Sequence, residues 1–383
     1  MKTRFAELKR TSRQPRGTVH VAALCAALIA ACTASGQDAS PPTSAAPAAA
    51  EAEAIEALLP EAPREVTPAT RTAIEKGLRY LAQTQNRDGS WRTSGGSGGY
   101  PTAMTALAGM ALLSGGNTPT QGPYARNVSS ALTYLLRGAR RDGLIAQEEE
   151  LAHCMHGHGF ATLFLAQCLG VEEDAQRQGQ LRLALQRAVE LTGRSQSVAG
   201  GWLYTPTAQA DEGSVTVTQV QALRACRNAG IAVSKKLIDS AMKYLDKSQN
   251  DDGGIRYQYS DSGPSRPAIT AAAVVCWYNA GIYDEPNVVK ALRFCERSLA
   301  PGTTPEGMFF GHYFYAHLYM SQVMYLAGEE KWRQYYPAIR DILIRKQADD
   351  GSWDGDHVGT TYGTAVALVI LQIPYKHLPI VQR

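Results

Sequence analysis

The stretch KQADDGSWDGDH, from Lys346 to His357, recurs in weaker forms along the chain. Its first half, Gln347–Trp353, has copies that keep a glutamine, a glycine and a large apolar residue in register: Gln85–Trp91, Gln196–Trp202 and Gln249–Ile255. Two less similar copies lie at Arg140–Ile145 and Pro305–Phe310. A turn-like joint that returns about every fifty residues is typical of a repeat protein.

Each joint separates two kinds of helical pattern. Before the first joint, apolar residues recur at three- and four-residue steps with charged residues between them: Ile74, Leu78 and Leu81. This pattern predicts an amphipathic helix with one solvent-exposed face. After this joint, Pro101–Leu113 is rich in Ala, Thr and aliphatic residues, which predicts a buried helix. We interpret the repeat as an outer helix, a turn and an inner helix. No run alternates with a period of two, so we expect no strands.

Six such hairpins could stack as an open solenoid or close into a ring. An open stack needs polar end repeats, whereas the last inner helix, from Tyr362, is as apolar as the middle ones. We therefore predict an all-α fold, an α/α toroid of six helical hairpins. Its inner helices would run parallel, with their N-termini at one rim.

The first 32 residues read as a secretory signal. Basic residues precede the apolar run VAALCAALIAAC, which is too short to span a membrane. The run ends at Cys32 in a sequence that resembles a bacterial lipobox, so we expect lipidation of Cys32, with cleavage after Ala34 as the alternative. Residues 33–66 predict a flexible Ala/Pro-rich linker and residues 67–383 the toroid domain. We expect an exported, cell-envelope protein that meets the membrane only through its lipid anchor.

Composition excludes some classes of function. The formal net charge is +3 and the basic residues are scattered, so we expect no nucleic-acid surface. We expect a monomer, and the predicted toroid is long enough to bury a single substantial core. Five cysteines lie within the predicted toroid without the spacing of a disulfide framework, and we interpret them as core residues: Cys154, Cys168, Cys226, Cys276 and Cys295.

The joints, their six-fold count and the stretch Asp350–Leu368 resemble the prenyltransferase and squalene-cyclase repeat superfamily. More narrowly, GHGFATLFLAQ (Gly157–Gln167) and FFGHYFYAHLYM (Phe309–Met320) resemble uncharacterised planctomycete-type secreted repeat proteins. The resemblance implies an α/α toroid with QW-like turns. It also implies two chemistries, alkene protonation by an Asp-x-Asp-Asp motif and zinc binding through an Asp-x-Cys pair. Neither motif occurs in this chain; the nearest is Asp211-Glu212-Gly213-Ser214, before the third inner helix.

Polar residues collect where the predicted inner helices begin. Parallel packing would gather them at one rim and bring His357 towards His312. The catalytic candidates are Asp211, Glu212, His312, Tyr313, Asp356 and His357. The candidate ligands of a zinc-like divalent metal are His156, His158, His312 and His357. The alternative is that such residues cap helix N-termini and bond the backbone.

Three functions remain open. The first is a lipoprotein that binds an apolar, isoprenoid-like molecule in the ring, and we favour it because both inherited motifs are missing. The second is a diverged isoprenoid-modifying enzyme of the terpene cyclase or prenyltransferase kind. The third is a polysaccharide lyase or hydrolase that uses rim histidines, tyrosines and carboxylates. An aromatic set on the fifth inner helix either lines the cavity or belongs to the core: Tyr313, Phe314, Tyr315, Tyr319 and Tyr325.

Overall fold

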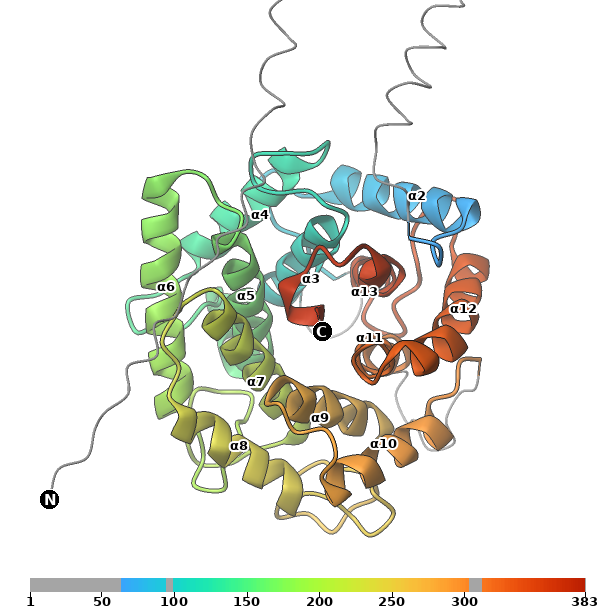
Figure 1. Ribbon diagram of the computed structural model, residues 1–383. Helices are drawn as coiled ribbons and strands as arrows, with labels where there is room; N and C mark the ends of the chain where they lie inside the picture. The colour runs from blue at the N-terminus through green and yellow to red at the C-terminus, as the bar shows by residue number, and fades with distance from the viewer. Residues whose placement is uncertain (1–62, 94–98, 303–311, 383) are drawn as a thin grey trace, which may run out of the picture. The chain divides into compact units, whose positions relative to one another are not determined.

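The computed structural model describes residues 63–93, 99–302 and 312–382. Over these residues the chain alternates between an outer and an inner ring of α-helices, with no strand (Figure 1). The outer helices are α2 (Pro68–Thr84), α4 (Ala125–Arg137), α6 (Ala175–Arg194), α8 (Lys235–Lys247), α10 (Pro286–Ser298) and α12 (Glu329–Lys346). The inner helices are α3 (Pro101–Ser114), α5 (Cys154–Leu169), α7 (Gly213–Asn228), α9 (Pro267–Asn279), α11 (Tyr313–Leu326) and α13 (Thr360–Gln372). The predicted all-α toroid of six hairpins is confirmed.

The two rings divide the hydrophobic surface as the patterns indicate. Every residue of α3 is buried, because this helix has outer helices on one side and inner neighbours on the others. In α4 only one face is buried, formed by Val128, Ala131, Leu132, Tyr134 and Leu135. The inner helices therefore form a continuous core that the amphipathic outer helices cover.

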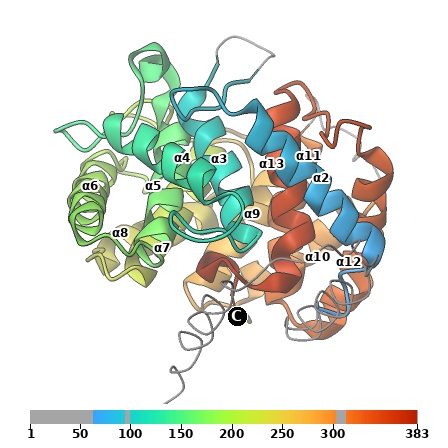
Figure 2. The ribbon, with the colours of Figure 1, turned by 90° about the horizontal axis from the view of Figure 1, so that it is seen from above.

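The ring is closed. Each inner helix packs on the next, and α13 packs back on α3, while α12 contacts α2 in the outer layer (Figures 1 and 2). Glu61–Arg383 forms one compact unit that contains this core and its closing contacts. We therefore expect this unit to fold without the residues before it.

In three of the joints a tryptophan connects an outer helix to the following inner helix by two hydrogen bonds. The Trp353 indole Nε1 donates to the carbonyl of Leu343 in α12 (2.7 Å), and its main-chain N–H donates to Thr364 Oγ1 in α13 (3.0 Å). Trp91 and Trp202 make the same pair of bonds in their own repeats. These residues and Ile255 are fully buried or nearly so, which confirms their structural interpretation. Phe309, in the same role by sequence, lies outside the described residues.

In four of the joints the glutamine donates to the next outer helix, and the joint glycine packs closely against it. Gln196 Nε2 donates to the carbonyls of Gly200 (2.8 Å) and of Leu237 in α8 (3.0 Å). Gly200 has φ +106°, and a Cβ added there would lie 2.3 Å from the carbonyl oxygen of Ser240. Only glycine fits both the left-handed backbone and this close approach. The same approach recurs at Gly89, Gly143, Gly253 and Gly351.

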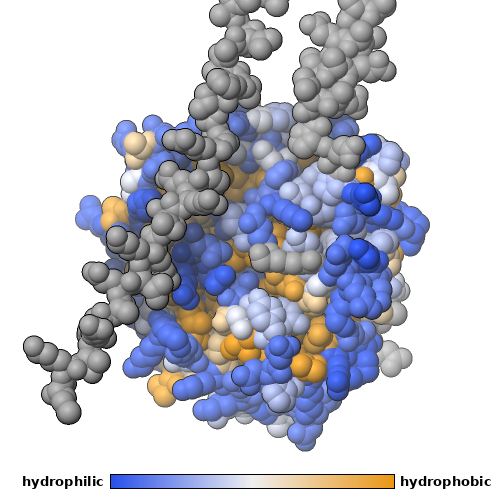
Figure 3. Space-filling model, in the orientation of Figure 1, coloured by the Kyte–Doolittle hydropathy of each residue, from blue (hydrophilic) through white to orange (hydrophobic). Residues whose placement is uncertain are grey.

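The segment that follows α13 crosses the face of the ring at which the inner helices end. Two short 3₁₀ turns, η2 (Ile373–Tyr375) and η3 (Pro379–Val381), follow α13, and η3 packs against α7 and α11 (Figures 1 and 2). On this face hydrophilic residues dominate the edge and apolar residues gather towards the middle (Figure 3). The opposite face, where the inner helices begin, carries the candidate site.

None of the helices among the described residues is both long and apolar enough to cross a membrane. The five cysteines of the toroid are buried free thiols, as predicted.

Candidate functional site

A cavity of about 600 Å³ lies inside the ring, where the inner helices begin. All six inner helices or the residues just before them contribute to its wall, so their N-termini share one rim as predicted. Its aromatic wall is formed by Tyr100, Phe160, Tyr204, Tyr257, Tyr315 and Tyr362, with Met104, Leu107 and Ile269 among them. The cavity is therefore mainly apolar and aromatic.

The aromatic helix α11 divides between cavity and core. Tyr315 lines the cavity, and its ring packs edge-on against Tyr319, 4.8 Å between centroids. Phe314, Tyr319 and Tyr325 are buried in the core. Tyr313 is half-buried beside α12, where the Lys346 ammonium lies 4.3 Å from its ring centroid. Of the two predictions for this aromatic set, lining the cavity is therefore correct for Tyr315, and belonging to the core is correct for Phe314, Tyr319 and Tyr325.

Polar side chains on the cavity wall are cationic or neutral. They are His153, His156, Ser214, Arg266 and His312. No carboxylate is present among the described residues that line the cavity. Burial, with the charges of Arg266 and His357, lowers the pKa of His312. Arg266 is therefore the permanent charge on this wall, and the N-termini of the inner helices add partial positive charge.

Glu212 lies directly behind this wall. It is the N-cap of α7, and its carboxylate accepts hydrogen bonds from the main-chain N–H groups of Ser214 (2.8 Å) and Val215 (2.5 Å). Its side chain is 0% exposed. Burial raises the pKa of Glu212 to about 7, although the capping bonds oppose this shift. Glu212 is thus a buried carboxyl group that is poised between its protonated and charged forms near neutral pH.

A hydrogen-bonded chain connects Glu212 to the cavity. Ser214 Oγ lies 2.8 Å from Glu212 Oε1 and 3.0 Å from His156 Nε2. The His156 side chain lines the cavity and is 30% exposed. Its burial among the helices and the nearby His153 lower the pKa of His156 to about 4, so the ring is neutral at pH 7. The order from core to cavity is therefore carboxyl, hydroxyl, imidazole.

His158 is not part of this site, and its interpretation as a metal ligand needs correction. The residue is fully buried, and Nδ1 accepts from the main-chain N–H of Ile145 (3.2 Å) while Nε2 lies 3.1 Å from Thr192 Oγ1. Thr364 occupies the equivalent place in the sixth repeat, where its hydroxyl accepts from Trp353. His158 is therefore the joint residue of the second repeat. Both of its ring nitrogens are in use.

The structure does not bring the four metal candidates together. His156 and His312 line the cavity, His158 lies in the second joint, and His357 is exposed outside the lining. Within the described ranges, no group of three or more His, Cys, Asp or Glu side chains is placed to hold a metal ion. The zinc-like site therefore stays a prediction without a ligand group in the described residues, although His357 does lie close enough to His312 for its charge to lower the pKa of His312.

Two carboxylates cap inner helices from other parts of the chain. Asp356 Oδ2 accepts from the main-chain N–H of Phe314 at the start of α11 (3.2 Å), and burial raises the pKa of Asp356 to about 6. Glu150 Oε1 accepts from Thr102 at the start of α3 (3.0 Å). Asp211, which accepts from Ser197 Oγ (3.2 Å), belongs to the third joint. None of the three lines the cavity.

Sequence reasoning missed the two tyrosines that close one side of the cavity. Tyr204 and Tyr257 line it, and their hydroxyl groups are hydrogen-bonded to each other. Each follows its joint by two residues, after Trp202 and Ile255 respectively. The sequence signal that could have identified these two residues is a tyrosine two positions after the joint in two consecutive repeats.

No protein family model matches the chain. Among curated proteins, it is 28% identical over 200 residues to a drimenyl diphosphate synthase of Streptomyces showdoensis, which corresponds to 52% of this chain and 34% of that protein. The chain thus spans about a third of the length of this relative.

Solved structures share the fold at low identity. A variant of a type II terpene cyclase from Scytonema, in complex with geranylgeranyl dihydroxybenzoate, has a TM-score of 0.56 at 16% identity and covers 81% of this chain and 98% of that chain. An inactive variant of an α-1,6-mannanase of Salegentibacter sp., in complex with α-1,6-mannotriose, has a TM-score of 0.57 at 10% identity, with 79% and 98% covered. Both structures share the fold of this chain, so the predicted toroid is confirmed as a fold; at these identities the likeness concerns the fold alone.

Proposed function

We propose that this chain, with the toroid fold of terpenoid cyclases, binds an apolar, isoprenoid-like molecule in the cavity at the N-terminal rim. The proposal rests on the composition of the cavity wall. Six aromatic side chains and several aliphatic ones surround a volume of about 600 Å³, and no carboxylate is among the described lining residues. Ligand sites of this size are commonly apolar, with a few polar groups that fix orientation. Arg266 and the histidines supply those groups at the rim.

The same wall disfavours the glycosidase alternative. Hydrolysis of a glycosidic bond normally needs two carboxyl groups, one on each side of the bond. Three described carboxyl groups at the starts of inner helices, those of Glu212, Glu150 and Asp356, cap these helices and do not line the cavity. The likeness to the mannanase therefore supports no more than the shared fold.

A second candidate function, a diverged isoprenoid cyclase, has one specific observation in its favour. A proton on Glu212 can pass to Ser214 Oγ while the Ser214 proton passes to His156 Nε2, across contacts of 2.8 and 3.0 Å. The resulting imidazolium would face the cavity, and the low pKa of His156 makes it a stronger acid than ordinary histidine. The drimenyl diphosphate synthase match is consistent with such chemistry but covers only part of that protein.

Binding is tested with the Glu61–Arg383 unit and geranylgeraniol, followed by native mass spectrometry and by quenching of intrinsic fluorescence. We expect one ligand per wild-type chain. Met104→Trp should abolish binding because it fills the cavity, whereas Leu183→Trp, on the exposed face of α6, should not. Failure of the wild type to bind, or unchanged binding by Met104→Trp with its fold intact, would refute the proposal.

Catalysis is tested separately by incubation with geranylgeranyl diphosphate and mass analysis of the products. A cyclised product that disappears in both Glu212→Gln and His156→Gln, with ligand binding retained, would establish the enzyme. Binding without any product in the wild type would leave the chain a binding protein.

We also propose that the protein is exported and held at the cell envelope through lipid on Cys32. The support is the sequence pattern alone, because Cys32 lies outside the described residues. The full-length protein should fractionate with membranes, and Cys32→Ala should release it. Wild-type protein found free of membranes would contradict the anchor.

A further inference from the structure

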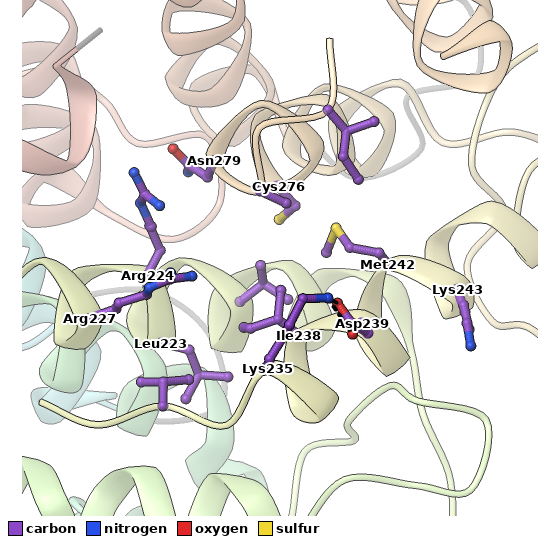
Figure 4. Close-up of a pocket in the computed structure, with 14 residues that line it drawn as sticks. Leu223, Arg224, Arg227, Lys235, Ile238, Asp239, Met242, Lys243, Cys276 and Asn279 are labelled. Carbon is purple, nitrogen blue, oxygen red and sulfur yellow. Dashed lines mark hydrogen bonds and ion pairs between the residues drawn. The ribbon is translucent and has the colours of Figure 1, made fainter. Parts of the chain in front are cut away.

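A second pocket lies at the other end of the ring, between the layers. It has a volume of about 630 Å³ and is formed by the last turns of the inner helices α7 and α9 and by Lys235–Lys243 of the outer helix α8 (Figure 4). The central cavity is lined by the starts of the inner helices, so the two cavities share no residue. This pocket has no part in the proposed central site.

Its floor is apolar. Leu223 comes from α7, Ile238 and Met242 from α8, and Ile282 from the segment after α9. Leu223 and Met242 are buried, which means that the floor is continuous with the packing between the two rings. An aliphatic chain laid on this floor would exchange water for apolar contact.

Its rim is basic. Arg224 and Arg227 extend from α7 and Lys243 from α8, and no hydrogen bond or ion pair engages these three side chains within the described residues. The fourth cation, Lys235, is paired with Asp239, Nζ to Oδ2 2.7 Å. Four cations and one carboxylate give the pocket a formal charge of +3 (4 − 1).

The helix ends do not cancel this charge. The C-termini of α7 and α9 each contribute about half a negative charge, and the N-terminus of α8 returns about half a positive one. The cap residue of α8, Ser234, makes no side-chain capping bond, although its carbonyl accepts from the main-chain N–H of Leu237 (3.2 Å). The pocket stays positive by about two charges or more.

The two ends of the pocket differ. Figure 4 shows Asn279 at the end where Arg224 and Arg227 lie, with Lys243 at the other end beyond Met242. The Asn279 Nδ2 atom is itself buried, so a ligand in the pocket does not reach it. The two arginines are therefore the donors at this end.

We infer that this pocket binds a small amphiphile that carries one anionic group, a carboxylate or a phosphate monoester, on an aliphatic chain. The anionic group lies against Arg224 and Arg227, whose guanidinium forks suit planar or tetrahedral oxyanions. The chain runs over Leu223 and Ile238 towards Met242. The floor and the rim each account for only one part of such a ligand. A free anion would leave the apolar floor in contact with water, and an uncharged chain would leave the cations without an anionic partner.

The experiment uses isothermal titration of the Glu61–Arg383 unit with dodecanoate and dodecyl phosphate below their micelle concentrations. Dodecanol and inorganic phosphate are the half-ligand controls. We expect one molecule of either charged amphiphile per chain. The variant Arg224→Gln/Arg227→Gln should weaken binding by about tenfold or more, since two charge-assisted contacts are lost. Arg126→Gln/Arg137→Gln, a matched pair on the exposed face of α4, should leave it unchanged.

A variant that occupies the pocket with a larger side chain tests the inference without changing the charge of the pocket. Ala280 is exposed at the lip of the pocket, so Ala280→Phe should block binding without loss of melting temperature. Binding that survives Ala280→Phe but is lost in Met104→Trp would place the amphiphile in the central cavity and overturn the inference. Equal affinity for dodecanol, or for inorganic phosphate, would overturn it too, because it would show that only one half of the pocket is recognised.

Discussion

Gln347, in the last joint, donates a hydrogen bond of 2.9 Å from Nε2 to the main-chain carbonyl of Ala73 in the first outer helix. The residues are 274 positions apart in sequence. Gln249 makes the equivalent bond to Asn287 in the next outer helix along the chain. The ring is thus closed by the same bond that joins its consecutive repeats.

Gln347→Ala should destabilise the protein by about 1–3 kcal/mol, because two buried carbonyl acceptors lose their donor. Gln249→Ala, inside the ring, should cost a similar amount. Urea unfolding of both variants makes the comparison. In an open solenoid the terminal joint would have no outer helix to bind, so a neutral Gln347→Ala beside a costly Gln249→Ala would contradict closure.

Trp353→Ala should cost about 3–5 kcal/mol, the usual range for a large aromatic residue removed from a core. Trp353 is 0% exposed and its indole N–H bonds the end of α12. Chemical denaturation with unchanged circular dichroism at zero denaturant measures the loss. A cost well below 1 kcal/mol would show that the joint does not hold the two helices together.

Gly200→Ala should destabilise by several kcal/mol, because the left-handed backbone strain of about 1–2 kcal/mol adds to a collision with the Ser240 carbonyl. Gly179→Ala is the matched control. Gly179 lies in α6 with nothing within 4 Å of an added Cβ, so alanine should stabilise that helix by up to about 1 kcal/mol. Thermal melts of the two variants should shift in opposite directions.

His158→Thr should make the protein less sensitive to acid. Burial lowers the pKa of His158 to about 4 from an ordinary value of 6.5, so the unfolded chain takes up the proton first as pH falls. The stability that neutral His158 contributes is present above pH 6.5 and is lost towards pH 4, by on the order of 3 kcal/mol. Threonine keeps the acceptor that the other joints use. Unfolding free energies of both proteins from pH 7 to 4 should converge or cross; parallel curves would contradict the buried imidazole.

Glu212→Gln should change the pH dependence with the opposite sign. The folded pKa of Glu212 is raised to about 7 from 4.5, so the native state holds this proton more tightly than the unfolded chain. Glu212 therefore makes stability fall as pH rises from about 4.5 to 7. The amide oxygen of Gln can still cap α7, and the fall should be smaller in the variant by on the order of 3 kcal/mol. An unchanged slope would mean that Glu212 ionises normally.

The sequence alone determined the repeat and the two kinds of helix, and the apolar last inner helix indicated that the ring closes. The repeat and the helix types are readable because they are local: the joint residues bond neighbours at fixed offsets, and helical periodicity shows which face is buried. The joint role of Trp353 and the core role of the cysteines follow from the same patterns.

Tertiary structure decided which polar residues face the cavity. His156 and His158 are two positions apart on one helix, so their side chains point about 200° apart. His156 reaches the cavity and Ser214, whereas His158 points back to Ile145 and α6. Sequence spacing places both at the rim, but the direction of each depends on how α5 is rotated between its neighbours. That rotation is set by packing across the whole ring, which no single repeat encodes.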